Sequence, residues 1–143
     1  MQHHAPRVSY SEVKHQLREL GVTKLQLGQP EVKKLSYVLF EDEVIQAFLF
    51  GFYEGGYGML AATDKRIIFL DIMPFGRFKI EDFPYGVVSA TELKMGLFSA
   101  ECTIFSRPKS LRFWWAKKDN AEFFVDYVEN RMLESQQRPA PKK

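Results

Sequence analysis

The sequence predicts a mainly β domain, in which seven short antiparallel strands form a barrel or orthogonal sandwich that a C-terminal helix caps. Three observations support this class. From residue 43 onward, helical spacing of apolar residues gives way to runs of β-branched and aromatic residues. Turn residues interrupt these runs as they do in a meander of short strands. Helical spacing returns only after residue 118, where phenylalanines begin a wide apolar stripe.

Two short helices are predicted before the sheet. The first opens at Ser9, with Glu12 placed three residues later as in a capping box, and it stops at Gly21. The second begins at Pro30 and ends near Leu39. The segment between them is predicted to be a connector. Because both helices are short and amphipathic, we expect them to pack on the barrel or on a second copy of the chain.

The strands are expected to follow one another through short turns. They are predicted over residues 44–53, 57–63, 66–72, 77–83, 87–95, 98–106 and 110–115. The apolar face of the sixth strand is predicted to contain Phe98, Ala100, Cys102 and Ile104. A meander of this size twists strongly and curls into a barrel or sandwich, and its open end needs a plug.

The terminal helix is the expected plug. It is predicted to open with Asp119 as N-cap and Glu122 three residues later. Its apolar stripe is predicted to hold Phe123, Phe124, Tyr127, Val128 and Met132. The predicted organisation is a helical N-terminal extension over residues 1–38, a β domain over residues 39–134, and a disordered tail over residues 135–143.

Composition limits the classes of function. The 143 residues include 20 basic and 18 acidic side chains, and a net charge of +2 is too balanced for a dedicated nucleic-acid-binding protein. A single cysteine excludes an internal disulfide. The sequence contains neither a recognisable secretory leader nor an apolar run long enough to span a bilayer. We therefore expect a cytoplasmic protein that does not bind nucleic acid.

No residue pattern predicts catalysis, a cofactor or a metal site. The three histidines lack the spacing and the companion ligands of a metal site. Cys102 is expected to be buried, and burial raises the pKa of a thiol and makes it a poor nucleophile. The acidic runs at residues 41–43 and 81–82 are interpreted as solvated charges at strand ends, which lack the burial that a general acid and base need.

The stretch over residues 51–71 resembles a known family. It reads G-F-Y-E-G-G and then T-D-K-R-I-I-F-L-D, the second run starting at Thr63. With Pro84, Gly96 and the closing helix, this order resembles the bacterial pleckstrin-homology (PH)-like domain family over about residues 39–130. The T-D-K-R-I-I-F run is similar to that of the related GRAM domains. The resemblance implies a binding or assembly module without enzymatic activity.

The same resemblance does not extend to the lipid-binding site of PH domains. PH domains that hold phosphoinositides place several Lys and Arg in the first hairpin, because phosphates need charge-assisted donors. Here that hairpin is E-G-G-Y, residues 54–57, with no basic side chain. Arg66 matches a family position, and we interpret it as paired with Asp64, with Asp71 or with a turn carbonyl rather than with an anion.

The loop after the third strand is one predicted contact region. Met73 and Phe75 are apolar, and Arg77 and Lys79 are cationic. An apolar tip beside cations is typical of a segment that touches a membrane surface, or a groove on a partner protein. In the alternative interpretation, Met73 and Phe75 fold back under the rim of the barrel.

The seventh strand is the other predicted contact region, with Arg112 and Trp114 on one face. An aromatic ring beside a cation suits single-stranded nucleic acid or cation–π packing, and no wider basic stripe supports the former. Trp114 and Trp115 are adjacent, so one of them faces outward, where the N-terminal helices or a second subunit could cover it.

Three hypotheses of function remain. The first is a protein-interaction or self-assembly module of the bacterial cytoplasm, acting on a protein partner or on a second copy of the chain. The alternative is peripheral binding to an anionic membrane, at its inner face, through residues 73–79. The third, an enzyme or carrier with a cavity inside the barrel, is disfavoured because large side chains would fill a small barrel.

Overall fold

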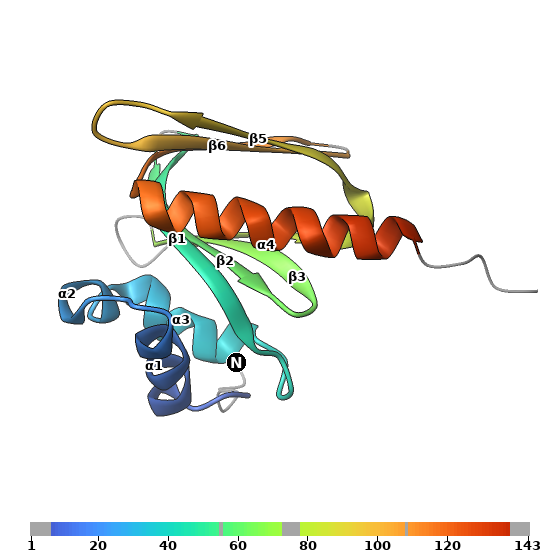
Figure 1. Cartoon of the computed structure of the whole chain (residues 1–143). Coiled ribbons are helices and arrows are strands. Elements are labelled where there is room, and N and C mark those ends of the chain that lie inside the picture. Colours follow the sequence, from blue (N-terminus) through green and yellow to red (C-terminus); the bar gives the residue numbers. More distant parts are fainter. Residues whose placement is uncertain (1–6, 55, 73–77, 108, 138–143) are drawn as a thin grey trace, which may run out of the picture.

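A computed structural model describes residues 7–54, 56–72, 78–107 and 109–137. It confirms the predicted class, because the chain forms seven antiparallel strands, helices before them and one long helix after them (Figure 1). The strands are β1 (Ile45–Tyr53), β2 (Gly56–Thr63), β3 (Arg66–Ile72), β4 (Phe78–Pro84), β5 (Val88–Met95), β6 (Ala100–Ser106) and β7 (Leu111–Ala116). The helices are α1 (Tyr10–Glu19), α2 (Lys24–Leu27), α3 (Pro30–Val38), the 3-10 turn η2 (Tyr85–Val87) and α4 (Lys118–Gln137).

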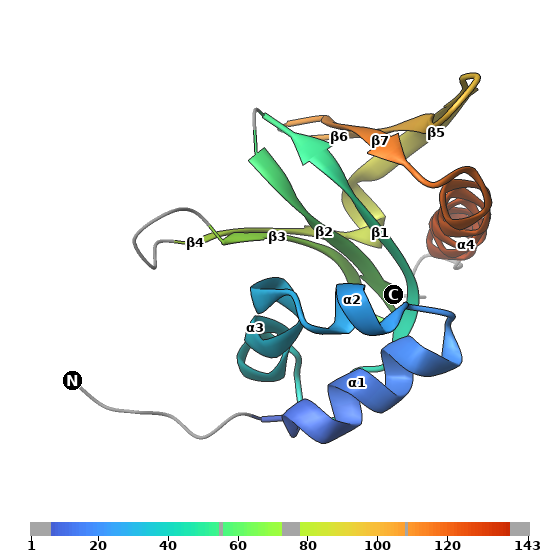
Figure 2. The same cartoon turned by 90° about the vertical axis from the view of Figure 1, so that its left-hand side faces the viewer.

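The strand order is β4-β3-β2-β1-β7-β6-β5, so the meander returns on itself and β7 pairs with β1 (Figure 2). Phe52 lies opposite Trp114 at this seam. The backbones approach closely there, because a Cβ on Gly51 would lie 2.5 Å from the Trp114 carbonyl oxygen. The sheet is therefore a curled half-barrel whose edges are β4 and β5.

Helix α4 lies along the inner face of the curled sheet and fills its core (Figures 1 and 2). It buries Ala121, Phe124, Val125, Val128 and Met132. The predicted stripe is wrong at Phe123, which is 50% exposed because it lies at the margin of the contact between α4 and β1, beside an open hollow. The helix begins one residue before the predicted N-cap, so Asp119 lies inside its first turn, where a carboxylate favours the helix dipole.

Helices α1, α2 and α3 cover the outer face of β1, β2 and β3 (Figure 2). The second hydrophobic cluster lies between them and contains Val13, Leu17, Val32, Leu35, Phe48, Phe50, Met59 and Ile68. Both predicted helices are confirmed: the Ser9 hydroxyl accepts from the Glu12 N–H, and Pro30 opens α3. The predicted connector contains a further helix, α2, whose capping box joins Thr23 and Gln26.

In the first hairpin, the residue with a positive φ is not a described glycine. Glu54, not Gly56, has a positive φ, of 50°. Gly56 lies close to β3, since a Cβ there would meet a carboxylate oxygen of Asp71 and the Asp71 side chain would have to move. Gly55 lies outside the described residues.

Candidate functional site

The T-D-K-R turn joins β2 to β3, and its arginine makes four hydrogen bonds within the protein. The Arg66 guanidinium lies 3.1 Å from each carboxylate oxygen of Glu43, through Nε and Nη2. Its other donors reach Asp82, at 2.8 Å, and the Val38 carbonyl at the end of α3, also at 2.8 Å. It also lies over the Phe40 ring. The predicted partners Asp64 and Asp71 are therefore wrong, although the structural role of Arg66 is confirmed.

Glu43 is the buried half of this pair and is only 1% exposed. Its carboxylate also accepts from the Thr63 hydroxyl at 2.5 Å and from the Phe40 N–H at 2.9 Å. Burial alone would raise the pKa of Glu43, but the hydrogen bonds from Arg66, Thr63 and Phe40 outweigh burial and lower that pKa. The interpretation of residues 41–43 as solvated charges is therefore wrong for Glu43.

The backbone of the same turn is held from the other side by β4, η2 and α4. The Thr63 carbonyl accepts from the Tyr85 hydroxyl at 2.5 Å and from the Tyr127 hydroxyl at 3.2 Å. Arg131 of α4 donates to the Asp64 carbonyl. The turn is thus a joint that connects α3, the sheet and α4. Its residue types stabilise the fold, and its arginine uses four of its five N–H donors on Glu43, Asp82 and the Val38 carbonyl.

The open end of the half-barrel, beside the first hairpin, carries a balanced charge cluster. Lys109 lies 2.6 Å from Glu54 and 3.1 Å from Glu81. Lys79 is paired with Glu54 and lies 3.6 Å from Glu81. Both ammonium groups lie 5.3 Å from the centre of the Tyr53 ring. Hydrogen bonds from Lys109 and then Lys79 lower the pKa of Glu54 to about 2.

Of the predicted loop contacts, Met73, Phe75 and Arg77 lie outside the described residues. Lys79 is described, and its charge is balanced by Glu54 and Glu81. The cluster therefore does not offer the unpaired cations that a phosphate group would need.

The structure brings Arg112 and Trp114 together on the outer face of the sheet, in what we call the aromatic face: Phe52, Tyr57, Arg112 and Trp114. The rings of Phe52 and Trp114 are stacked, with centroids 6.4 Å apart and planes 20° apart. Tyr57 packs edge-on against Phe52 at 5.1 Å. The Arg112 guanidinium lies 6.0 Å from the Trp114 ring and is bonded to Glu101.

The aromatic face continues the row of side chains that the N-terminal helices cover. Phe48 and Phe50 on the same side of β1 are buried beneath these helices, whereas Phe52 is half-buried and Tyr57 is exposed. Beside it, Glu101, Arg112 and Trp114 line an open hollow of about 220 Å³. Large rings held in fixed positions at a partly uncovered surface are typical of association sites.

Trp115 faces solvent because of a bulge. Ala116 pairs with Ala100, and Phe113 with Cys102, so Trp114 and Trp115 together lie opposite Glu101. Trp115 has φ 64°, which a bulky residue rarely adopts, and it is 61% exposed.

The tip of the β5–β6 hairpin is a surface that the sequence interpretation missed. Leu97 and Phe98 are 81% and 85% exposed, and Met95 is also exposed. The prediction that Phe98 lies on the buried face of β6 is wrong, because the strand begins at Ala100 and Phe98 belongs to the turn. The signal was present in the M-G-L-F run, which places large apolar residues on both sides of Gly96.

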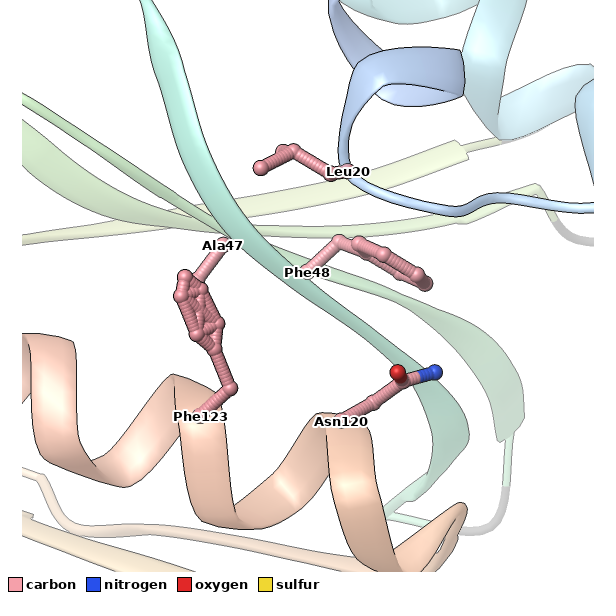
Figure 3. A pocket seen from close by; sticks show the side chains of 5 residues that line it. All are labelled: Leu20, Ala47, Phe48, Asn120 and Phe123. Atoms are coloured by element: carbon pink, nitrogen blue, oxygen red, sulfur yellow. The ribbon is translucent and has the colours of Figure 1, made fainter.

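A small hollow lies between α1, β1 and α4, lined by Leu20, Ala47, Phe48, Asn120 and Phe123 (Figure 3). Phe123 points from α4 toward Ala47, and Leu20 lies on the other side of β1. The hollow holds about 20 Å³, the space of one water molecule, so it is too small for an organic ligand.

The described residues contain a buried thiol but no cluster of metal ligands. Cys102 is fully buried, and burial raises the pKa of its thiol to about 12, as expected. Within the described ranges, no group of three or more His, Cys, Asp or Glu side chains could hold a metal ion. None of the helices in the part of the chain that the structure describes is long and apolar enough to cross a membrane.

Solved structures of other proteins share this fold. A PH domain from Shewanella amazonensis superposes with a TM-score of 0.52 at 17% identity, over 70% of this chain and 93% of that one. A DUF1696 family protein with a PH domain from Shewanella loihica gives a TM-score of 0.51 at 16% identity, over 69% of this chain and 87% of that one. At these identities the similarity shows the fold alone.

Sequence comparison gives a relative and a family. An uncharacterised protein of Archaeoglobus fulgidus is 31% identical over 70 residues, which cover 48% of this chain and 37% of that protein, so the chain spans little more than a third of the relative's length. The family described as Bacterial PH domain matches residues 39–130, from the end of α3 into α4. That match spans more than half of the sequence, and the chain therefore belongs to the bacterial PH domain family.

Proposed function

We propose that the chain is a non-enzymatic binding module of the bacterial cytoplasm, and that its aromatic face docks a protein, either a partner or a second copy of the chain. The observation that carries this proposal is the stacked pair Phe52 and Trp114 at the β1–β7 seam, with Tyr57 packed on its edge. PH domains are generally interaction modules, and membership of the family supports a role in binding over catalysis.

The physical character of the aromatic face favours a protein over a small ligand. Aromatic rings and arginine are enriched at the centres of protein interfaces. Here the rings hold one another in place, so docking would order few additional side chains. The hollow beside them is open, and its charged groups Glu101 and Arg112 already neutralise each other. Such a rim suits the polar border of a protein interface.

Membrane binding through residues 73–79 has less support from the described residues. Lys79 is the described cation of that segment, and its pairing with Glu54 and Glu81 reduces the charge available to a lipid phosphate. Placement at the inner face of a membrane is therefore not proposed for that segment.

The test combines mass measurement with site-specific cross-linking. Light scattering across a range of concentrations reports self-association of the chain, and Tyr57→Ser and Arg112→Glu should weaken it. For a separate partner, a photo-cross-linking residue at position 57 should give a discrete adduct in cells, and the same residue at Leu25 on α2, which is 81% exposed, should not. A monomer at every concentration, with equal adducts at both positions, would contradict the proposal.

A further inference from the structure

The β5–β6 hairpin ends in an apolar tip that no packing in the described chain explains. We call Met95, Leu97 and Phe98 the hairpin tip. The hairpin projects beyond the start of α4, away from the N-terminal helices, in both views of the molecule (Figures 1 and 2). Leu97 and Phe98, at 81% and 85%, are more exposed than Trp115 at 61% or Phe123 at 50%. Adjacent large apolar side chains at such exposure indicate a contact site.

The turn that presents the hairpin tip is held in one shape. The Gly96 N–H donates to the Ser99 carbonyl at 2.8 Å. A Cβ at position 96 would lie 2.9 Å from that carbonyl oxygen, so the tight turn favours glycine. Lys118, from the first turn of α4, donates to the Leu97 carbonyl at 2.8 Å. The tip is therefore presented by backbone that both the hairpin and α4 fix.

Lysines lie around the base of the tip. Lys94 precedes Met95 on β5, and Lys117 and Lys118 lie where β7 leads into α4. Lys94 is 3.6 Å from Glu92, and both are largely exposed, so the ion pair is weak. Lys118 donates to the Leu97 carbonyl rather than to a carboxylate. Among the described residues, the Lys117 ammonium has no ion pair or hydrogen bond. In the sequence, the acidic residue Asp119 follows Lys117 and Lys118.

Trp115 lies at the same end of the sheet. Its neighbour Ala116 pairs with Ala100, and Ala100 pairs with Met95 at the base of the tip. An exposed tryptophan held at a positive φ costs free energy, which is typical of residues kept for a contact. Tryptophan is also the residue that prefers the boundary between lipid headgroups and hydrocarbon.

We propose that the hairpin tip inserts into the surface of an anionic lipid bilayer, with Leu97 and Phe98 entering the hydrocarbon boundary and Lys94, Lys117 and Lys118 facing lipid phosphates. The shape of the tip favours a bilayer over a protein. A stable protein interface buries about 800 Å² on each side, more than the end of one hairpin offers. A bilayer accepts a narrow apolar tip and supplies the negative charge that the lysines complement. This proposal does not depend on docking at the aromatic face, because it uses different residues.

Vesicle co-sedimentation of the full chain tests the proposal. The probes are vesicles of phosphatidylcholine alone and of phosphatidylcholine with phosphatidylglycerol, at low and at physiological salt. The wild-type chain should bind the anionic vesicles and bind the neutral ones at least about fivefold more weakly. Replacing Leu97→Ser and Phe98→Ser together should lower partitioning about tenfold or more, because each change removes a large apolar side chain that the bilayer would bury.

The controls separate insertion of the hairpin tip from non-specific adsorption of the protein to vesicles. Leu25→Ser removes a leucine with the same 81% exposure from α2 and should leave partitioning within about twofold of wild type. Tyr57→Ser, on the aromatic face, should also leave it unchanged. Lys117→Glu should weaken binding about fivefold and reduce its dependence on salt. Far-UV circular dichroism checks that each variant folds.

Tryptophan fluorescence gives a second, independent measure. Trp115 should shift its emission to shorter wavelength on anionic vesicles in the wild-type chain and not in the Leu97→Ser, Phe98→Ser variant. Absence of wild-type binding to anionic vesicles at low salt would overturn the proposal. Equal losses in the Leu25 and the tip variants, or equal binding to neutral and anionic vesicles, would overturn it as well.

Discussion

Arg66 and Glu43 form a two-point ion pair between the β2–β3 turn and the segment before β1, with Nε to Oε2 and Nη2 to Oε1 both at 3.1 Å. The Glu43 side chain is fully buried and that of Arg66 is 13% exposed. The pair connects residues 23 apart in sequence, and Arg66 also binds the carbonyl that ends α3. It therefore fixes the N-terminal helices to the sheet.

Breaking this pair should destabilise the protein strongly. Arg66→Ala leaves the Glu43 carboxylate buried without its cation, and we expect a loss of about 3 kcal/mol in the free energy of unfolding. Urea unfolding measures it. The adjacent Lys65 provides the control, because its 3.4 Å pair with Asp42 is exposed and Lys65→Ala should cost less than about 1 kcal/mol. Similar losses in the two variants would contradict a special role for Arg66.

The same pair predicts a pH dependence. The pKa of Glu43 is lowered in the folded protein from an ordinary value of 4.5. Its stabilising contribution is therefore complete above that value, and it is lost as the pH falls through the lowered pKa of the folded state. We expect the difference in stability between the wild type and Glu43→Gln to shrink as the pH falls below about 4.5. Denaturant unfolding at pH 7, 4.5 and 3 measures it. A difference that stays constant would exclude Glu43 as the titrating group.

The seam between β1 and β7 should not tolerate a side chain at Gly51. In Gly51→Ala the new Cβ would lie 2.5 Å from the Trp114 carbonyl oxygen and 2.7 Å from the Phe113 ring. We expect the strands to separate, with a loss of about 2 kcal/mol or more and a weaker near-UV circular dichroism signal from the stacked rings. In Gly86→Ala the nearest atom would be 3.7 Å away, so that variant should be close to neutral. A neutral Gly51→Ala would show that the seam has room.

Trp115 should be dispensable for stability. Its φ of 64° costs about 1 kcal/mol for a side chain with a Cβ, and glycine avoids that cost. We expect Trp115→Gly to leave the unfolding free energy unchanged or to raise it by about 1 kcal/mol. Trp114→Gly, which removes the ring stacked on Phe52, should lower it by about 2 kcal/mol or more. Equal losses would mean that Trp115 is held by packing.

The class of fold was predictable because the period of the apolar residues changes clearly near residues 43 and 118. The predictions of local structure were wrong where a turn or a very short helix interrupts the regular spacing of apolar residues. Starting the alternation of β6 at residue 98 placed Phe98 in the core, although the turn that begins at Gly96 continues to Ser99. Helix α2 was missed because four residues give no period, and only its Thr23–Gln26 cap marks it.

The surfaces show the same limit. The alternation of side chains along a β-strand was enough to place Arg112 and Trp114 on one face. Phe52 and Tyr57 join them only because β1 pairs with β7. These strands lie about sixty residues apart, and no local sequence pattern reveals their pairing. Glu43 looked like one of several solvated acids because its partners Thr63 and Arg66 come from another turn.

Strand β1 packs against other elements on both faces, and this affects where the boundary of the domain can lie. Its inner side chains Ala47, Leu49 and Tyr53 belong to one hydrophobic cluster, and its outer side chains Phe48 and Phe50 belong to the other. The family match begins at residue 39, yet a chain that started there would expose the outer row to water. The segment that matches the family is thus smaller than the packed unit of this chain, in which α1, α2 and α3 cover the outer row of β1. We expect relatives without α1, α2 and α3 to carry polar residues along the outer row, or to cover it with a different segment.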